Sequence, residues 1–100
     1  MATEHPPIDY VISRIRDYVR CHNDGLDPYR VDSHLGIYHF TIFFVANHAS
    51  SAIYVSRDDR VLLVVTPQGD SWFHNSQEIV YDELLPELER ALLLDDLAGA

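Results

Sequence analysis

Six histidines, at positions 5, 22, 34, 39, 48 and 74, are the residues of this chain best suited to metal binding or proton transfer. Asp32 and His34 are two residues apart, so on a strand both would project from one face, and His39 could lie opposite them across a hairpin. Two imidazoles and a carboxylate can hold a transition metal. The spacing matches no familiar ligand motif, and scattered histidines are mostly surface residues, so we expect no metal and no other cofactor.

A second group of reactive residue types is Gly69-Asp70-Ser71, with His74 three residues beyond the serine. The string is similar to the nucleophile block of GDSL-type esterases, and His74 would then be the nearby base. Those enzymes place the serine on a strand-to-helix turn of a much longer α/β sheet and bring an Asp-x-x-His from near the chain end. This chain has no such element, and a lone Ser/His pair lacks an orienting acid and an oxyanion hole. We expect a turn, pinned to the core by Trp72 and Phe73.

The residue types that the sequence lacks exclude several classes of catalytic and metal site. All seven basic residues are arginines, so Schiff-base, pyridoxal-phosphate and P-loop sites, which need a lysine, are excluded. Cys21 is the only cysteine, which excludes an internal disulfide and a thiolate zinc cluster. The opening residues do not look like a signal peptide, and the longest apolar runs, Phe40–Ala46 and Val61–Val65, are too short to span a bilayer. We expect a soluble cytoplasmic protein that does not bind membranes.

The chain has 100 residues, 47% of them hydrophobic, which suits a single domain over residues 1–100. Apolar periodicity predicts a helix at about 7–23 and another at about 82–96. Between them, runs of β-branched and aromatic residues predict an antiparallel sheet over about 29–74. Its expected strands are Tyr29–Asp32, Ile37–Ala46, Ala52–Ser56 and Arg60–Thr66, with Ser71–Asn75 as a candidate for a short fifth strand at the edge. The predicted class is α+β, in the order α-β-β-β-β-α with the helices flanking the sheet.

The longest predicted strand is largely apolar on both faces. One row contains Tyr38, Phe40, Ile42 and Phe44, and the other contains Ile37, His39, Thr41, Phe43 and Val45. Two helices normally cover only one face of a four-stranded sheet, so the second face needs another cover. A curled sheet, or helices split between the two faces, would supply this cover within the chain. Otherwise a second copy or a different protein covers it, with Phe43 as a candidate contact.

The second predicted helix has leucines outside its core stripe, which consists of Leu84, Leu85, Leu88, Ala91 and Leu92. If the helix stays regular, Leu93, Leu94 and Leu97 face water. Monomers rarely expose contiguous apolar patches, so these three leucines are candidates for an interface. The alternative is that the helix frays near Leu93 and that the tail folds back onto the core.

Charge is unevenly distributed along the chain. The 16 acidic and seven basic residues give a formal charge of −9, and residues 51–100 carry ten of the acids and three of the arginines. An acidic face on the second helix could bind a basic partner surface or could only solubilise the protein; its candidate contacts are Glu83, Glu87, Asp95 and Asp96. The net charge opposes direct nucleic-acid binding, although Arg14, Arg16 and Arg20 make the first helix locally basic. We expect those arginines to form a solvated face of mixed charge.

No complete catalytic arrangement emerges from the sequence, so we expect a non-catalytic acidic protein-binding module. An inhibitor, an immunity or anti-defence protein, or a chaperone-type adaptor would suit this size and charge, acting through an apolar sheet face and the acidic C-terminal helix. We also expect a homodimer. The competing hypothesis is a small hydrolase or metal-dependent enzyme that uses the sheet histidines and aspartate or the Asp70-Ser71-His74 loop.

A third hypothesis is a subunit whose histidines report pH. Protonation of all six would change the formal charge from −9 to −3. Any assembly should then change between about pH 8 and pH 6.

Overall fold

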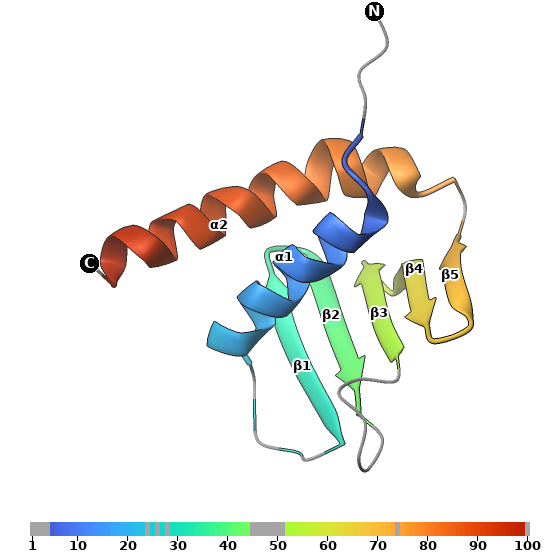
Figure 1. The fold of residues 1–100 in the computed structure, drawn as a ribbon, viewed down its shortest axis with the longest axis horizontal. Coiled ribbons are helices and arrows are strands. Elements are labelled where there is room, and N and C mark those ends of the chain that lie inside the picture. Colours follow the sequence, from blue (N-terminus) through green and yellow to red (C-terminus); the bar gives the residue numbers. More distant parts are fainter. Residues whose placement is uncertain are drawn as a thin grey trace, which may run out of the picture.

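In the computed structural model, the described residues form two α-helices, a π-helical segment and a five-stranded antiparallel sheet (Figure 1). The structure describes residues 5–23, 25, 27, 29–44, 52–73 and 75–99. The elements are α1 (Ile8–Cys21), β1 (Arg30–Leu35), β2 (Tyr38–Phe43), β3 (Ala52–Arg57), β4 (Arg60–Thr66), β5 (Gly69–Trp72), the π-helical segment η1 (Ile79–Leu84) and α2 (Leu85–Ala98). The predicted α+β class with flanking helices is confirmed, and the sheet has the fifth strand.

The strands pair in chain order, so the sheet is a meander with β1 and β5 at its edges. Gly36 (φ 60°) closes the β1–β2 hairpin, and Asp58 and Asp59 (φ 50° and 65°) close the β3–β4 hairpin. Left-handed residues suit two-residue hairpin loops, because their twist matches that of the strands. β1 extends beyond the predicted Tyr29–Asp32, since its pairing with β2 continues up to the turn. Val45 and Ala46, the last residues of the predicted strand Ile37–Ala46, lie outside the described residues.

β5 begins two residues before the edge strand that the sequence predicts at Ser71–Asn75. Gly69 pairs with Thr66 across a two-residue turn, in which the Thr66 hydroxyl donates to the Gly69 carbonyl oxygen (3.1 Å). Trp72 packs against the core, as expected, whereas Phe73 is 40% exposed. Trp72 is therefore the one of these two aromatic residues that anchors this edge.

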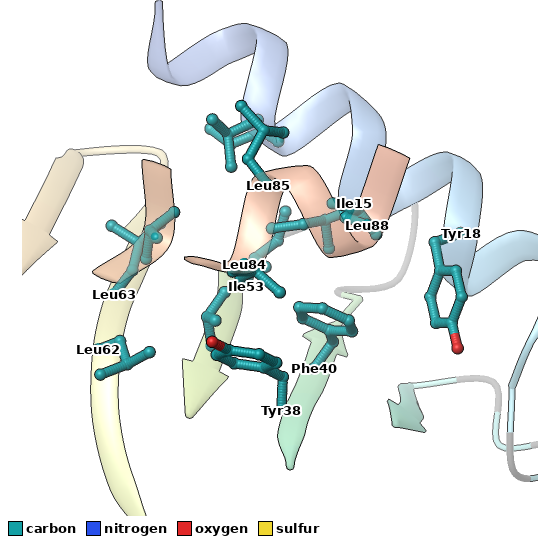
Figure 2. Packing of buried hydrophobic residues seen from close by; sticks show 14 of the residues in the cluster. Ile15, Tyr18, Tyr38, Phe40, Ile53, Leu62, Leu63, Leu84, Leu85 and Leu88 are labelled. Carbon is teal, nitrogen blue, oxygen red and sulfur yellow. The ribbon is translucent and has the colours of Figure 1, made fainter. Parts of the chain in front are cut away.

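Both helices pack on the same face of the sheet and share one core (Figure 2). Tyr38 and Phe40 of β2 belong to this core, together with Ile15 of α1, Leu84 of η1 and Leu88 of α2. The two helices also contact each other. The alternative in which the helices split between the two faces is therefore wrong. The opposite face of the sheet carries no helix of the described residues, and we refer to it as the outer sheet face.

β4 contributes two consecutive leucines to the core. The register between β3 and β4 shifts between Val55 and Ser56, so β4 has one extra residue at this point. Leu62 and Leu63 are both fully buried, although consecutive residues of a regular strand point to opposite faces. The bulge allows β4 to fill more of the core than strict alternation would.

The C-terminal helical region begins earlier than residue 82, where the sequence predicts it. Helical turns start at Gln77, and η1 leads directly into α2. Pro86 accounts for the wider turn, because proline has no N–H to donate to the carbonyl four residues before it. The N–H of Leu85 donates instead to the carbonyl of Val80, five residues before it, which is the π-helical pattern.

Candidate interaction surfaces

α2 extends beyond α1 and the sheet at its C-terminal end (Figure 1). The helix is regular to its last residue, so the alternative in which it frays near Leu93 is wrong. Leu93, Leu94 and Leu97 are 59%, 59% and 66% exposed. Because a helix turns by about 100° per residue, Leu93 and Leu97 point away from the side that buries Leu88. The distal α2 surface, as we term it here, consists of Leu93, Leu94, Asp96 and Leu97.

Contacts with α1 and with the residue that follows it position α2. Nε2 of His22, the residue after α1, lies 2.7 Å from Oδ2 of Asp95. The His22 ring also stacks on Tyr18, with 4.4 Å between the ring centroids. Near the start of α1, the Tyr10 hydroxyl donates to the carboxylate of Glu89. The protruding helix end is therefore positioned by the fold, although its outer side has no cover among the described residues.

The four acidic candidates of the C-terminal helix lie in different surroundings. Oε1 of Glu83 is 3.4 Å from Nη1 of Arg57 on β3, and Asp95 makes the histidine contact described above. Glu87 is half-buried beside the β1–β2 turn. Asp96 is exposed and forms no ion pair with any residue that the structure describes. The carboxylate available to a partner next to the leucines is therefore that of Asp96.

Phe43, the candidate contact on the sheet, lies half-buried on the outer sheet face. Its ring meets the Tyr54 ring edge-on at 5.5 Å between centroids, and the Arg30 guanidinium lies over it at 5.7 Å. α2 packs on the other face of the sheet, so the structure does not bring Phe43 to the three exposed leucines. The outer sheet face and the distal α2 surface are two separate surfaces.

Asp32, His34 and His39 come together on the outer sheet face, as their spacing predicts. The two histidines pair across the β1–β2 hairpin, and their stacked rings have centroids 4.4 Å apart. Oδ1 of Asp32 lies 2.9 Å from Nε2 of His39 and accepts a hydrogen bond from the Thr41 hydroxyl, also at 2.9 Å. Burial alone would raise the pKa of the Asp32 carboxyl, but hydrogen bonds from Arg30, Thr41 and His39 outweigh burial and lower that pKa.

This cluster is a hydrogen-bonded network. An ionised Asp32 can only accept hydrogen bonds, so Nε2 of His39 donates, and Nδ1 is the unprotonated nitrogen of the neutral ring. Among the residues with a described position, no group of three His, Cys, Asp or Glu side chains is placed to hold a metal ion. The network can orient an imidazole and stabilise a carboxylate.

The residues of the candidate esterase-like loop are only partly described. Asp70 and Ser71 lie exposed on β5, and His74 lies outside the described residues. Burial and, to a smaller extent, the negative charge of Asp70 raise the pKa of the Tyr81 phenol. In the described part of this loop, the charge of Asp70 therefore acts on the phenol of Tyr81, which packs against the core.

A cleft of ≈330 Å³ separates the C-terminal half of α1 from the ends of β1 and β2. It combines an apolar lining with two guanidinium groups. The Arg20 side chain is 77% exposed, and its Nη1 lies 3.9 Å from Oδ1 of Asp17. The α1–sheet cleft, as we term it, is formed by Arg16, Val19, Arg20, Asn23, Val31, Ile42 and Phe44.

Sequence reasoning missed this cleft because its residues come from three separate elements. The available signal was that Arg16 and Arg20 are four residues apart and therefore lie on one face of the helix, with Val19 beside them. That pattern alone is also typical of an exposed face. The strand residues that complete the cleft could be identified only after the helix had been placed on the sheet.

No family model, curated protein or solved structure matches this chain. In the part of the chain that the structure describes, no helix is both long and apolar enough to cross a lipid bilayer. Function must therefore be inferred from the surfaces described above.

Proposed function

We propose that this protein is a non-catalytic protein-binding module that binds its partner through the distal α2 surface. The observation that carries this proposal is the exposure of Leu93, Leu94 and Leu97, which is 59–66%, on a helix end that α1 holds in place. Full burial of one leucine side chain contributes about 1.5–3 kcal/mol. A partner that covers all three leucines therefore gains several kcal/mol without having to order the helix first.

The chemistry of the distal α2 surface defines the partner. Three leucines require an apolar groove, and the exposed carboxylate of Asp96 favours a basic residue at its rim. The formal charge of −9 steers the protein towards basic surfaces and away from nucleic acid. We infer that the module acts as an inhibitor or adaptor that occupies such a groove on another protein chain.

The distal α2 surface is favoured over the outer sheet face because of what surrounds each. On the sheet, Phe43 contacts Tyr54 and Arg30, and the two stacked histidines cover part of each other. These side chains already shield one another from water. No described side chain shields the leucines of α2 to a comparable degree. A partner that buries them therefore gains more hydrophobic free energy there than on the sheet.

The test compares the proteins bound by the unaltered chain with those bound by a variant in which two leucines are replaced by aspartate. The tagged chain and its Leu93→Asp/Leu97→Asp variant are produced in the source cells, cross-linked and purified. Each captured protein is then made recombinantly, and its affinity is measured by calorimetry. Ile37→Asp is the matched control, because Ile37 is 57% exposed but lies at the β1–β2 turn.

We expect the double variant to lose its partner and the Ile37→Asp control to keep it. Each leucine substitution should weaken binding by about ten-fold or more, since buried anchor residues dominate protein interfaces. All variants should unfold at similar temperatures, because the substituted positions are exposed. A partner that binds the double variant as tightly as the unaltered protein would contradict the proposal.

A second candidate, an enzyme that uses acid–base chemistry, is favoured by the network on the outer sheet face. Asp32 orients the His39 imidazole through a 2.9 Å contact, an arrangement that general-base catalysts use. Hydrolysis of a panel of small esters, lost in His39→Ala and retained in His34→Ala, would support it. Equal rates for all three proteins would exclude it.

A further inference from the structure

Two features of the molecule complement each other in shape and charge. The distal α2 surface protrudes and combines exposed leucines with the carboxylate of Asp96. The α1–sheet cleft is hollow and combines an apolar lining with Arg16 and Arg20. Apolar side chains are stabilised by leaving water, and an arginine–carboxylate contact fixes their orientation. Each feature offers the groups that the other one requires.

Both features lie near the C-terminal end of α1. The 2.7 Å contact between His22 and Asp95 brings the distal half of α2 to this end. Two cleft residues, Arg20 and Asn23, lie within two positions of His22 in the chain. Because the two regions lie close together in each subunit, two identical subunits can exchange both contacts around a two-fold axis.

The chain cannot make this contact with itself. α2 buries Leu88 and presents Leu93 and Leu97 on roughly the opposite side of the helix. Turning these leucines towards the chain's own cleft would rotate Leu88 out of the core and break the contact between His22 and Asp95. The leucines of α2 can therefore enter such a cleft only on another molecule.

We propose that the distal α2 surface of one copy docks into the α1–sheet cleft of a second copy, and that the second copy does the same in return. In this two-fold dimer, the leucines of each α2 cover the apolar lining of the partner copy's cleft. Asp96 of each copy faces Arg20 of the other. This inference rests on the proposed function of the distal α2 surface and names a second copy of this chain as a partner that this surface binds.

The proposed pairing can be tested by mixing two variants with reversed charges. Arg20→Glu alone places two carboxylates at each contact, and Asp96→Arg alone places two guanidinium groups there. Each variant should therefore dimerise about ten-fold or more weakly than the unaltered protein. In an equimolar mixture, one chain of each kind has an oppositely charged pair at both contacts. We expect native mass spectrometry to show the mixed dimer as the main species.

The matched control uses the same charge changes at positions away from both surfaces. Arg60→Glu and Asp82→Arg alter exposed residues on β4 and η1. Alone or mixed, they should dimerise as the unaltered protein does, with no preference for the mixed dimer. Circular dichroism and thermal unfolding show whether every variant is folded. A contact between Arg20 and Asp96 within one chain would not produce the mixed-dimer preference.

The possible results separate this inference from the proposed function. An unaltered protein that stays monomeric at about 1 mM overturns the dimer, because a contact weaker than that would have no specific role. A dimer that Leu93→Asp/Leu97→Asp dissociates but Arg20→Glu does not overturns docking in the cleft, and it leaves partner binding by the leucines intact. A mixture of Arg20→Glu and Asp96→Arg in which the mixed dimer is not the main species also overturns the inference. Failure of the proposed function appears separately, as partner binding that the leucine substitutions do not change.

Discussion

Asp32 joins the two strands of the first hairpin through a single carboxylate. It accepts hydrogen bonds from Arg30 on its own strand and from Thr41 and His39 on β2. Hydrogen bonds to a carboxylate stabilise its ionised form, which is why the pKa is lowered even though burial acts in the opposite direction. The network also orients the cross-strand histidine pair on the outer sheet face.

Replacing Asp32 with asparagine should destabilise the protein only where the carboxylate is ionised. Because the folded pKa lies below the ordinary value of 3.8, the stabilisation is complete above that pH and is lost as the pH falls through the lowered pKa. We expect Asp32→Asn to lower the free energy of unfolding by about 1 kcal/mol at pH 7, measured by urea denaturation. The difference from the unaltered protein should shrink towards pH 3.

Asp59→Asn is the control for this experiment, because Asp59 is exposed and its φ of 65° is one that asparagine tolerates. Its free energy of unfolding should stay within about 0.5 kcal/mol of the unaltered value. A deficit in Asp32→Asn that stays constant between pH 7 and pH 3 would show that the carboxylate charge does not contribute.

Among the elements, the β1–β2 hairpin lies next to both α1 and α2. The two strands of the hairpin supply the floor of the α1–sheet cleft, and the turn at Gly36 lies next to Glu87 of α2. Gly36 has φ 60°, a conformation in which a Cβ clashes with the backbone. The turn therefore fixes the register that places Asp32 beside the two histidines.

Gly36→Ala should lower the free energy of unfolding by about 1 kcal/mol, because alanine is strained at positive φ. A Cβ at this position would also lie 3.4 Å from Oε1 of Glu87. Gly25→Ala is the matched control, since nothing lies within 4 Å of a Cβ there and its φ is not in the left-handed region. Chemical denaturation of both variants measures the effect. Equal stability of the two would show that the turn does not require glycine.

At the scale of the whole molecule, self-association has to overcome electrostatic repulsion. Each copy carries a formal charge of −9, so two copies repel at long range while Arg20 and Asp96 attract locally in the proposed dimer. Hydrophobic contacts by the leucines must supply most of the remaining free energy. The balance between these contributions should respond to conditions that change the net charge.

Lowering the pH from about 8 to about 6 should strengthen dimerisation, because protonated histidines reduce the repulsion between copies. Complete protonation would bring the formal charge to −3. Sedimentation equilibrium at both pH values measures the dissociation constant. At about 0.5 M salt, where long-range charge interactions are screened, the pH effect should become smaller. A dissociation constant that is the same at both pH values in low salt would contradict this explanation.

The sequence by itself determined the types and order of the elements, because these depend on local patterns. Three- and four-residue periodicity predicts α1, and the stripe through Leu84 and Leu88 predicts the core side of α2. Runs of β-branched and aromatic residues predict the strands of the antiparallel sheet, and the hairpin that brings His39 opposite His34 is present. The same periodicity identified Leu93 and Leu97 as lying off the core stripe, and the structure confirms their exposure.

Tertiary structure alone decided which surfaces these elements form together. It placed both helices on one face of the sheet, added a bulge that buries Leu62 and Leu63, and separated Phe43 from the leucines of α2. It also formed the α1–sheet cleft from residues between Arg16 and Phe44. Periodicity shows which side of an element is apolar, but it does not specify which other element covers that side. That choice depends on how all the apolar faces pack together at once, and contacts between residues far apart in the chain determine it.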